Sequence, residues 1–546
     1  SEVRIRGAEA NHTLLFIDGI RANDPAAGDV PRFELLNADL ASRIEVVRGP
    51  QSALWGSDAI GGVVAISGND QPGFSAASEA GSFGFRRATA SGGVAREKAS
   101  LSGAIGFQRA SGINSFDGPG DKEGYRNLSG RLRGTFAVSP ALRLGASGFI
   151  LTGRSQYDGF DPFSFAHADT LDSTRNRLAA GRLWVEVGDR HKPWAGHVAI
   201  SALTSTNRNL LAGDPVNRTA GKRRTIEGQV ERHVITGAID HRLILAAESE
   251  DERFHSRDVI YGGFSNQDQS RAHQAVTAEW RGETKRFTAD LALRRDIFNR
   301  FKDATTLRVS GLAKLGGGFS IAASYGEGIA QPTFFDLYGF FPGSFIGNPS
   351  LKPESSRGVE GSLRYRKGAI SGALTLYRQR LHDEIVDVFD FATFQSSTVN
   401  RARTSRRGGV ELELGWQLSE RLRVSGNYAY LRATQPDDFG GGQLTELRRP
   451  KSSGSVALDG SAGKFAYGAS LAFVGKRDDR RDSFPYDVVS LKAYALLSAR
   501  LAYTVRPGIE GFARISNALG SRFEDVYNYR TEGRGIFAGI RVAPRR

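Results

Sequence analysis

Carboxylates gather in one glycine-rich stretch, Asp117-Gly-Pro-Gly-Asp121-Lys-Glu123-Gly, and Asp158 follows in the next long polar segment. Ca²⁺ takes six to eight oxygen ligands and tolerates flexible loops, so carboxylates from two neighbouring loops can surround it. The stretch is not an EF-hand, because the alternating Asp-x-Asp-x-Asp-Gly spacing is missing. We expect Asp117, Asp121, Glu123 and Asp158 to hold a structural Ca²⁺. The alternative is a solvated acidic loop, which Lys122 in its middle favours.

Aromatic side chains gather in a second stretch. In a surface loop, six aromatics cost free energy unless they pack together or contact an apolar ligand. Both interpretations are open, and we take Phe335, Tyr338, Phe340 and Phe341 as candidate ligand contacts. The six are Phe334, Phe335, Tyr338, Phe340, Phe341 and Phe345.

Motifs for catalysis are missing. The sequence has no Gly-x-Ser-x-Gly elbow, no His-Glu-x-x-His and no phosphate loop ending in Gly-Lys-Ser/Thr. It has no cysteine, which excludes disulfides, thiol nucleophiles and cysteine-ligated metals, and its 9 histidines are scattered. We therefore expect a protein that is not an enzyme and requires no cofactor.

Charge and composition exclude further classes. The 73 Lys and Arg residues outnumber the 59 Asp and Glu residues, for a net charge of +14. The arginines are spread along the chain instead of forming a basic tract, so we expect no nucleic-acid partner. No run of about 18 apolar residues predicts a transmembrane helix.

The dominant pattern is alternation of apolar and polar residues, which is the period of a β-strand. Val410, Leu412 and Leu414 point one way, and Glu411 and Glu413 point the other. Such segments recur from about residue 76 to the C-terminus, separated by alternating short and long connections. At roughly 20 residues per strand they predict an all-β membrane protein, an antiparallel transmembrane barrel of about 22 strands. The alternative, a soluble β-propeller, needs a fixed blade period, and none is visible.

The first 70 residues break this pattern. Residues 14–21 form a hairpin signal around Asp18-Gly19. Residues 42–66 place a strand, the turn Arg48-Gly49-Pro50, a short helical stretch, the bend Gly61-Gly62 and a last strand in that order. This order resembles the plug domain of TonB-dependent outer-membrane receptors. Two later segments, 331–355 and 515–534, are similar to the mid-barrel passage and the closing strands of the same family.

The resemblance implies a domain division and a location. Residues 1–70 would be the C-terminal part of the plug and 71–546 the barrel, in the bacterial outer membrane. The TonB box and the first half of the plug would lie upstream of Ser1. The implied partners are the energy-transducing protein TonB, the barrel-assembly machinery, and the lipid bilayer with its lipopolysaccharide, around a monomeric barrel.

Function and site residues also follow from the resemblance. It implies active import of a large, scarce nutrient, with Arg21, Asn23 and Asp24 of a plug apex and Tyr157 of an extracellular loop touching the substrate. We expect the cargo to be cobalamin or a related corrinoid, because the short barrel and the placement of the acidic loop are similar to the cobalamin receptors. A ferric siderophore is the alternative, and a passive porin or adhesin is a more distant one. Within the lumen, Arg43, Glu45 and Arg48 are candidates to pair with Glu411 and Glu413.

Overall fold

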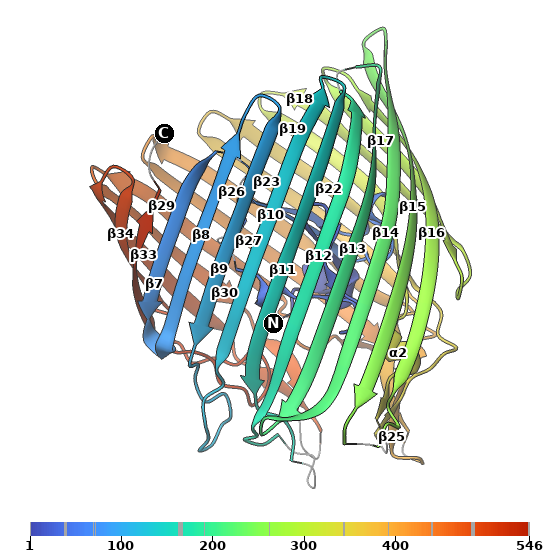
Figure 1. Cartoon of the computed structure of the whole chain (residues 1–546), viewed down its shortest axis with the longest axis vertical. Helices are drawn as coiled ribbons and strands as arrows, with labels where there is room; N and C mark the ends of the chain where they lie inside the picture. Colours follow the sequence, from blue (N-terminus) through green and yellow to red (C-terminus); the bar gives the residue numbers. More distant parts are fainter. Residues whose placement is uncertain are drawn as a thin grey trace.

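Most of the strands from β7 to β35 form a closed antiparallel barrel around the N-terminal residues (Figure 1). The computed structural model describes residues 2–37, 41–68, 70, 72–161, 167–189, 192–260, 262–341, 344–390, 392–437, 440–481 and 486–543. Within these ranges, 22 long strands pair in sequence order, the short β28 (Gln443–Thr445) pairs with the end of β27, and β35 closes the barrel by pairing with β7. The prediction of an all-β barrel of about 22 strands is confirmed. No helix among the described residues is long and apolar enough to span a membrane.

The barrel strands have the following bounds. They are β7 (Gly73–Gly81), β8 (Phe85–Ala95), β9 (Ala99–Ala110), β10 (Tyr125–Ser139), β11 (Leu142–Tyr157), β12 (Asp172–Gly188), β13 (Trp194–Leu211), β14 (Asp214–Thr236), β15 (Ile239–Asp258), β16 (Gln267–Glu283), β17 (Phe287–Phe298), β18 (Ala304–Gly316), β19 (Phe319–Ala330), β22 (Glu354–Lys367), β23 (Ile370–His382), β26 (Ser405–Ser419), β27 (Leu422–Pro436), β29 (Ser452–Ala462), β30 (Phe465–Val474), β33 (Tyr494–Arg506), β34 (Ile509–Ser516) and β35 (Gly535–Val542).

The two ends of the barrel differ in their connections. At one end the strands are joined by short turns, such as the two residues between β14 and β15, and at the other by long loops, such as the one between β9 and β10. Outer-membrane barrels have short periplasmic turns and longer extracellular loops, so we call the long-loop end, at the bottom of Figure 1, the extracellular end. Two small sheets lie in these loops, β20 (Phe340–Phe341), β21 (Phe345–Ile346), β24 (Ile385–Asp390) and β25 (Gln395–Asn400) in one and β31 (Arg477–Arg480) with β32 (Val488–Leu491) in the other.

The alternating apolar and polar residues of each strand lie on opposite faces of the barrel wall. On β10, Leu128, Leu132 and Phe136 are exposed on the outside, whereas Ser129 and Arg131 are buried on the lumen side. The reversed polarity, apolar outside and polar inside, suits a wall that stands in lipid. Along β10 the outward apolar positions run from Leu128 to Val138, which at about 3.3 Å per residue and a tilt of about 40° gives a band roughly 25 Å tall.

The N-terminal part is a small α/β unit inside the lumen. Its sheet has the order β2-β1-β6-β5, in which β1 (Thr13–Ile17) and β6 (Gly62–Ser67) are parallel and β2 (Ile20–Arg21) and β5 (Arg43–Arg48) flank them. The hairpin predicted at Asp18-Gly19 is present, and both residues have positive φ. The unit also contains β3 (Asn23–Asp24), β4 (Val30–Pro31) and the helix α1 (Ser52–Trp55).

The plug and the barrel share one hydrophobic core. Leu15, Ile17 and Val64 of the plug pack against Phe149 and Leu178 of the wall. Each of these side chains has only a few per cent of its surface exposed. Burial of this kind contributes about 1.5–3 kcal/mol for each apolar side chain. The plug is therefore a folded domain that is packed against the barrel wall.

Candidate functional site

Residues 42–66, the stretch that resembles a plug domain, contain the bend at Gly61-Gly62. Its two glycines lie where the chain meets itself: a Cβ on Gly62 would stand 2.3 Å from the carbonyl oxygen of Val47, and one on Gly61 would stand 2.7 Å from the Cβ of Ala8. Gly62 also has φ +153, in the region that favours glycine. The Gly-Gly pair is therefore required by close backbone approach.

Two plug arginines form salt bridges with carboxylates of the lumen wall near this bend. Arg6 bonds to Glu411 through its Nε at 3.0 Å and to Glu360 through its Nη1 at 2.8 Å. Arg48 pairs with Glu411 at 3.0 Å and with Glu413 at 2.9 Å, as predicted. Arg43 does not reach the wall; it pairs with Glu45 two residues along the same exposed strand, because both side chains point to the same face of β5.

A second set of charges is buried where the plug meets β14, β15 and β16. Arg21 of the plug pairs with Asp29 at 2.7 Å, Asp58 at 2.5 Å and Glu250 of the wall at 3.3 Å. Arg223 of β14 pairs with Asp29 at 2.6 Å and donates from Nε to Glu252 at 2.7 Å. We call this set the buried charge cluster; its members are Arg21, Asp29, Asp58, Arg223, Glu250, Glu252 and Arg271.

The buried charge cluster holds four carboxylates against three guanidinium groups, so its charges do not balance if every carboxylate is ionised. Burial raises the pKa of Asp58 to about 6, a rise that Arg21 opposes and the nearby Asp29 increases. Burial would also raise the pKa of Asp29, but Arg223 and Arg21 outweigh it and hold that pKa below its ordinary value. Of Asp29 and Asp58, Asp58 is therefore the one that takes up a proton first as the pH falls.

The plug residues predicted to touch substrate are packed inside the protein in this conformation. Arg21 belongs to the buried charge cluster. Asn23 is fully buried; its side chain accepts from the Leu15 N–H and donates to the carbonyls of Thr13 and Asp29. Asp24 accepts from Asn207 of β13 at 3.0 Å. The three residues fasten the apex to the wall, and their contact with substrate stays a prediction.

Two neighbouring aromatic residues of the predicted loop differ in exposure: one is buried and the other is exposed. The helix α2 (Phe334–Tyr338) starts with a capping box between Thr333 and Asp336. Phe334 is buried, stacked on Phe254 of β15 with ring centroids 5.4 Å apart. Its neighbour Phe335 keeps 40% of its surface exposed.

The remaining aromatics lie over the extracellular end. Phe335 stacks on Phe345 at 4.7 Å and lies 6.0 Å from Phe341. Tyr338 accepts a hydrogen bond from Arg300 at 2.6 Å. The side chain of Phe340 lies outside the described residues. Phe335, Phe341 and Phe345 therefore form one aromatic patch, in which Phe335 is the exposed member among the described side chains.

Three of the four predicted metal ligands come together. Asp121, Glu123 and Asp158 lie with Asp169, and one oxygen of each is within 4.8 Å of the others. Opposite ligands of a Ca²⁺ are about 4.6–5.2 Å apart, so this spacing fits the ion. Asp117 is outside the group, because it pairs with Arg530 of the β34–β35 loop. Asp169, which the sequence analysis missed, follows Asp158 in the same loop.

The other predicted residue, Tyr157, lies at the extracellular end of a wall strand, and three partners of the plug that were not predicted lie in the wall. Tyr157 ends β11 with 38% of its surface exposed. Sequence reasoning missed Arg223, Glu250 and Glu252 as partners of the plug. Glu250 and Glu252 are two residues apart on β15, so the sequence pattern places them on the same face of the strand. The pattern does not reveal which plug residue they contact.

Comparisons with known proteins agree with this architecture. Residues 66–518 match the family model "TonB dependent receptor-like, beta-barrel", and residues 1–63 match the "TonB-dependent Receptor Plug Domain". Among solved structures, the siderophore receptor PirA from Acinetobacter baumannii is 16% identical with a TM-score of 0.81, covering 99% of this chain and 92% of that one.

Two further structures have the same fold. The FrpB iron transporter from Neisseria meningitidis is 13% identical with a TM-score of 0.82, covering 98% of this chain and 92% of that one. The copper transporter OprC is 14% identical with a TM-score of 0.80, covering 99% and 91%. With a family model that spans most of the sequence and a plugged barrel that closes, the chain belongs to the TonB-dependent receptor family of outer-membrane transport proteins.

Proposed function

We propose that this receptor imports a ferric siderophore through the TonB system. The observation that carries the proposal is the pairing of arginine with tyrosine in the extracellular loops. Arg300 lies over the Tyr338 ring at 5.5 Å, and Arg481 lies over the Tyr527 ring at 5.5 Å. Many ferric chelates are anionic and carry aromatic rings, and cations beside aromatic faces suit both features.

The expectation of cobalamin has less support than the siderophore alternative. Solved neighbours of the same fold include proteins titled as siderophore receptors, such as the ferric enterobactin receptor PfeA from Pseudomonas aeruginosa, 16% identical with a TM-score of 0.81. The copper transporter OprC has the same fold, so another metal cargo is the second candidate class. The acidic loop, which suggested cobalamin, is equally compatible with a siderophore receptor.

The plug contacts suggest how transport is coupled. A lumen of this width leaks unless it is filled, and the folded plug fills it. The outer membrane holds no nucleotide, so the energy to move the plug must arrive as a pull from the periplasmic side. Arg6 lies near the start of the plug sheet, so its pairs with Glu360 and Glu411 are exposed to that pull before the buried charge cluster is.

A fluorescence titration tests the cargo. Trp55 of the plug helix α1 is 38% exposed, and its ring is tilted against that of Phe16 with centroids 5.2 Å apart, which makes it a reporter inside the lumen. We expect saturable quenching with one of a panel of ferric siderophores and none with cyanocobalamin. The matched control is the same siderophore without iron. Saturation by cyanocobalamin alone would overturn the siderophore proposal.

Energy coupling is tested separately by leakage. In liposomes the plugged receptor should show little diffusion of small sugars, because the plug core packs against the wall. A steady conductance like that of a porin would contradict active import.

We also propose that Asp121, Glu123, Asp158 and Asp169 bind Ca²⁺ between two extracellular loops. Burial raises the pKa of Glu123, the N–H of Ser115 opposes this, and Asp158 adds to it. A bound cation would relieve the crowding of negative charge and fix both loops before ligand arrives, which lowers the entropic cost of binding. Calorimetry with CaCl₂ tests this, with Asp117→Asn as the matched control that should leave binding unchanged.

A further inference from the structure

Two extracellular loops combine in one small sheet. Residues 331–353 join β19 to β22, and residues 383–404 join β23 to β26. Their strands pair in the order β20-β21-β25-β24, and we call these four strands the loop sheet. Asn400 of the second loop donates to the backbone carbonyl of Lys352 in the first at 2.9 Å. The two loops are therefore one body.

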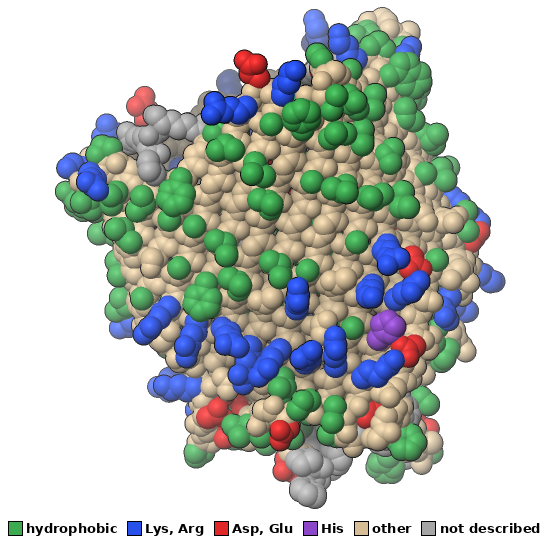
Figure 2. All heavy atoms as spheres, viewed as in Figure 1, with side chains coloured by type: hydrophobic (Ala, Val, Ile, Leu, Met, Phe, Trp, Pro, Cys, Tyr) green, Lys and Arg blue, Asp and Glu red, His purple; other side chains and the backbone are tan. Residues whose placement is uncertain are grey.

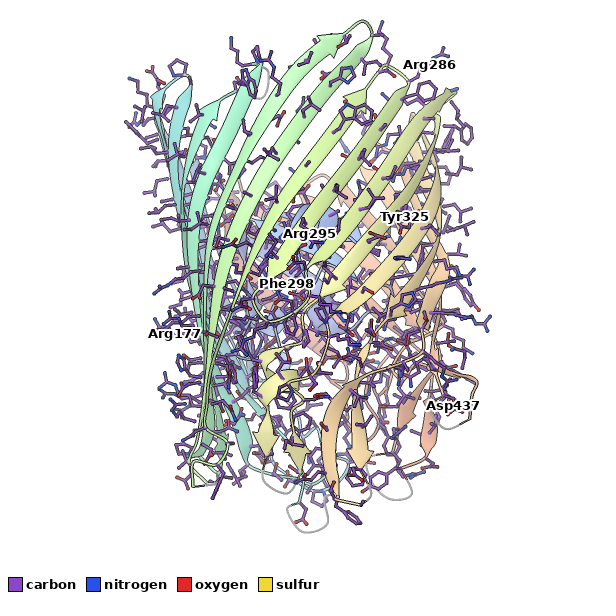
Figure 3. All side chains as sticks on the ribbon, turned by 90° about the vertical axis from the view of Figure 1, so that its right-hand side faces the viewer. Arg177, Arg286, Arg295, Phe298, Tyr325 and Asp437 are labelled. Carbon is purple, nitrogen blue, oxygen red and sulfur yellow. The ribbon has the colours of Figure 1, made fainter. Side chains whose placement is uncertain are left out.

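The loop sheet lies at the extracellular end of the barrel. Figure 2 shows the hydrophobic band of the outer wall ending, on the extracellular side, at a row of Lys and Arg side chains. Figure 3 labels Tyr325 on β19 and Phe298 at the end of β17, and it shows short strands beyond Phe298 at this end. Lipid does not surround these strands, so their position depends on contacts with the rest of the protein.

The start of the first loop is bonded to the plug. The pairing of β18 with β19 ends at Gly326, although β19 continues beyond it. Plug residues take the place of β18 there: the Asp58 N–H donates to the Ile329 carbonyl at 2.7 Å, and the Ile329 N–H donates to Ser52 Oγ at 3.0 Å. The N–H of Gln331, the first loop residue, donates to the Asp58 carboxylate at 3.1 Å.

The end of the first loop and the start of the second share one plug contact. Nε2 of His12 in the plug lies 2.5 Å from Oε2 of Glu354, the first residue of β22. The other carboxylate oxygen of Glu354 accepts from the N–H of Ile385, the first residue of β24, at 2.8 Å. His12 and Glu354 are both buried. A single plug side chain therefore holds the bases of both loops.

The plug backbone lies directly on the strands from which the first loop emerges. A Cβ on Gly326 of β19 would stand 2.6 Å from the carbonyl oxygen of Pro50, and one on Gly358 of β22 would stand 2.9 Å from the Pro50 Cδ. A Cβ on Gly328 would stand 3.2 Å from the Cα of Ile60. These glycines form a close-fitting seat, so a shift of the plug cannot leave the two contacts with the loops in place.

We propose that the plug latches the loop sheet, so that the sheet keeps its position only while the plug is docked. When the plug moves, the His12–Glu354 and Asp58–Gln331 contacts must break with it. A buried carboxylate or N–H without a partner is costly, so water must enter at the bases of the loops and the loop sheet becomes mobile. The extracellular end thus loosens as the path through the lumen opens. The latch involves no cargo, so it does not depend on which nutrient is imported.

Releasing the plug from another part of the wall tests the latch. Arg131 of β10 bonds to Asp18 of the plug at 2.7 Å, and eight strands separate β10 from β19. In Arg131→Met we expect the amides of β1 and β6 and those of residues 329–331 and 385–390 to exchange with deuterium at least tenfold faster, by a common factor, because one opening exposes them all.

The matched control is Arg126→Met, which removes an exposed, outward-facing arginine of the same strand and should change neither set of amides. Heat-modifiable gel mobility checks that each barrel folds. If Arg131→Met does not assemble, Asp18→Asn breaks the same ion pair from the plug side.

The latch is also tested at its own contact. In His12→Leu the loop sheet should move, whereas His12→Gln can still donate to Glu354 and should restore its position. The chain has no cysteine, so spin labels can be attached at Ala392→Cys, in the β24–β25 turn, and at Ala212→Cys, in the two-residue β13–β14 turn. Electron–electron resonance should give one narrow distance in the unaltered receptor and in His12→Gln, and a broad distribution in His12→Leu and Arg131→Met.

Three results would overturn the proposal. The first is a narrow distance in both His12→Leu and Arg131→Met. The second is faster exchange of β1 and β6 in Arg131→Met without faster exchange of residues 329–331 and 385–390. The third is a distribution in His12→Gln as broad as that in His12→Leu, which would show that packing around His12, and not its bond to Glu354, positions the loop sheet.

Discussion

Removing Arg223 should release the plug apex without unfolding the barrel. Arg223 is 2% exposed and holds three groups at once: Asp29 at 2.6 Å, Glu252 at 2.7 Å and the backbone carbonyl of Asn23 at 2.8 Å. In an Arg223→Met variant, Asp29 and Glu252 stay buried without this partner. Loss of one partner from a buried ion pair costs about 3–5 kcal/mol.

That cost falls on the docked plug, because two of the three bonded groups belong to the plug. At 1.4 kcal/mol for each factor of ten, the undocked population should rise roughly a hundredfold to a few thousandfold. The assays are conductance of the receptor in planar bilayers, which should show more frequent openings, and hydrogen exchange of the β1 and β6 amides, which should accelerate. Barrel strands on the opposite wall should exchange as before.

Two further variants test the reasoning. Arg224 is the next residue and faces outward, so Arg224→Met is a matched control that should leave plug exchange unchanged. Combining Arg223→Met with Asp29→Asn and Glu252→Gln removes the stranded charges and leaves two acids with two arginines in the cluster, so most of the docking should return. The reasoning is refuted if Arg223→Met exchanges like the unaltered receptor, or if the triple variant is as open as the single one.

Three other predictions concern pH, cargo and calcium. Asp58 has a pKa raised to about 6, so the stabilisation of the docked plug by its protonated form is complete below about pH 4 and is lost as pH rises through 6; Asp58→Asn should flatten the pH dependence of plug exchange between pH 4 and 7, and an unchanged slope would contradict it. Phe335→Ala should weaken ferric siderophore binding roughly tenfold, whereas Phe394→Ala, which removes a 71% exposed ring from a hairpin tip, should not; equal effects would show that Phe335 is no ligand contact. Replacing Asp121 by Asn together with Glu123 by Gln should abolish the calorimetric signal for Ca²⁺ and leave barrel assembly intact, and no signal from the unaltered receptor at millimolar Ca²⁺ would identify a solvated loop.

The sequence by itself determined the strands and their two faces, because both follow from a period of two along a single segment. Leu412 and Leu414 on one face, with Glu411 and Glu413 on the other, are readable without any partner strand. The Asp18-Gly19 turn and the Gly61-Gly62 bend were also readable, since each depends on backbone conformations that few residues adopt.

The site was predictable only in part. Asp121, Glu123 and Asp158 were placed together correctly, because two loops joined to adjacent strands must lie side by side. Asp117 was not, since its partner Arg530 is supplied by a loop more than 400 residues away. The apex residues Arg21, Asn23 and Asp24 match a substrate-facing motif, but the wall that covers them is formed by strands whose lumen faces cannot be assigned to a particular plug residue from spacing.

Register and closure were decided only by the tertiary structure. Whether Arg126 faces Arg154 or a residue two places away depends on the loop between the strands and on every pairing around the barrel, up to β35 closing on β7. Periodicity says that these arginines point outward and is silent on their height. The buried charge cluster arises from that alignment, because charges interact over a few ångströms between segments that the sequence keeps far apart.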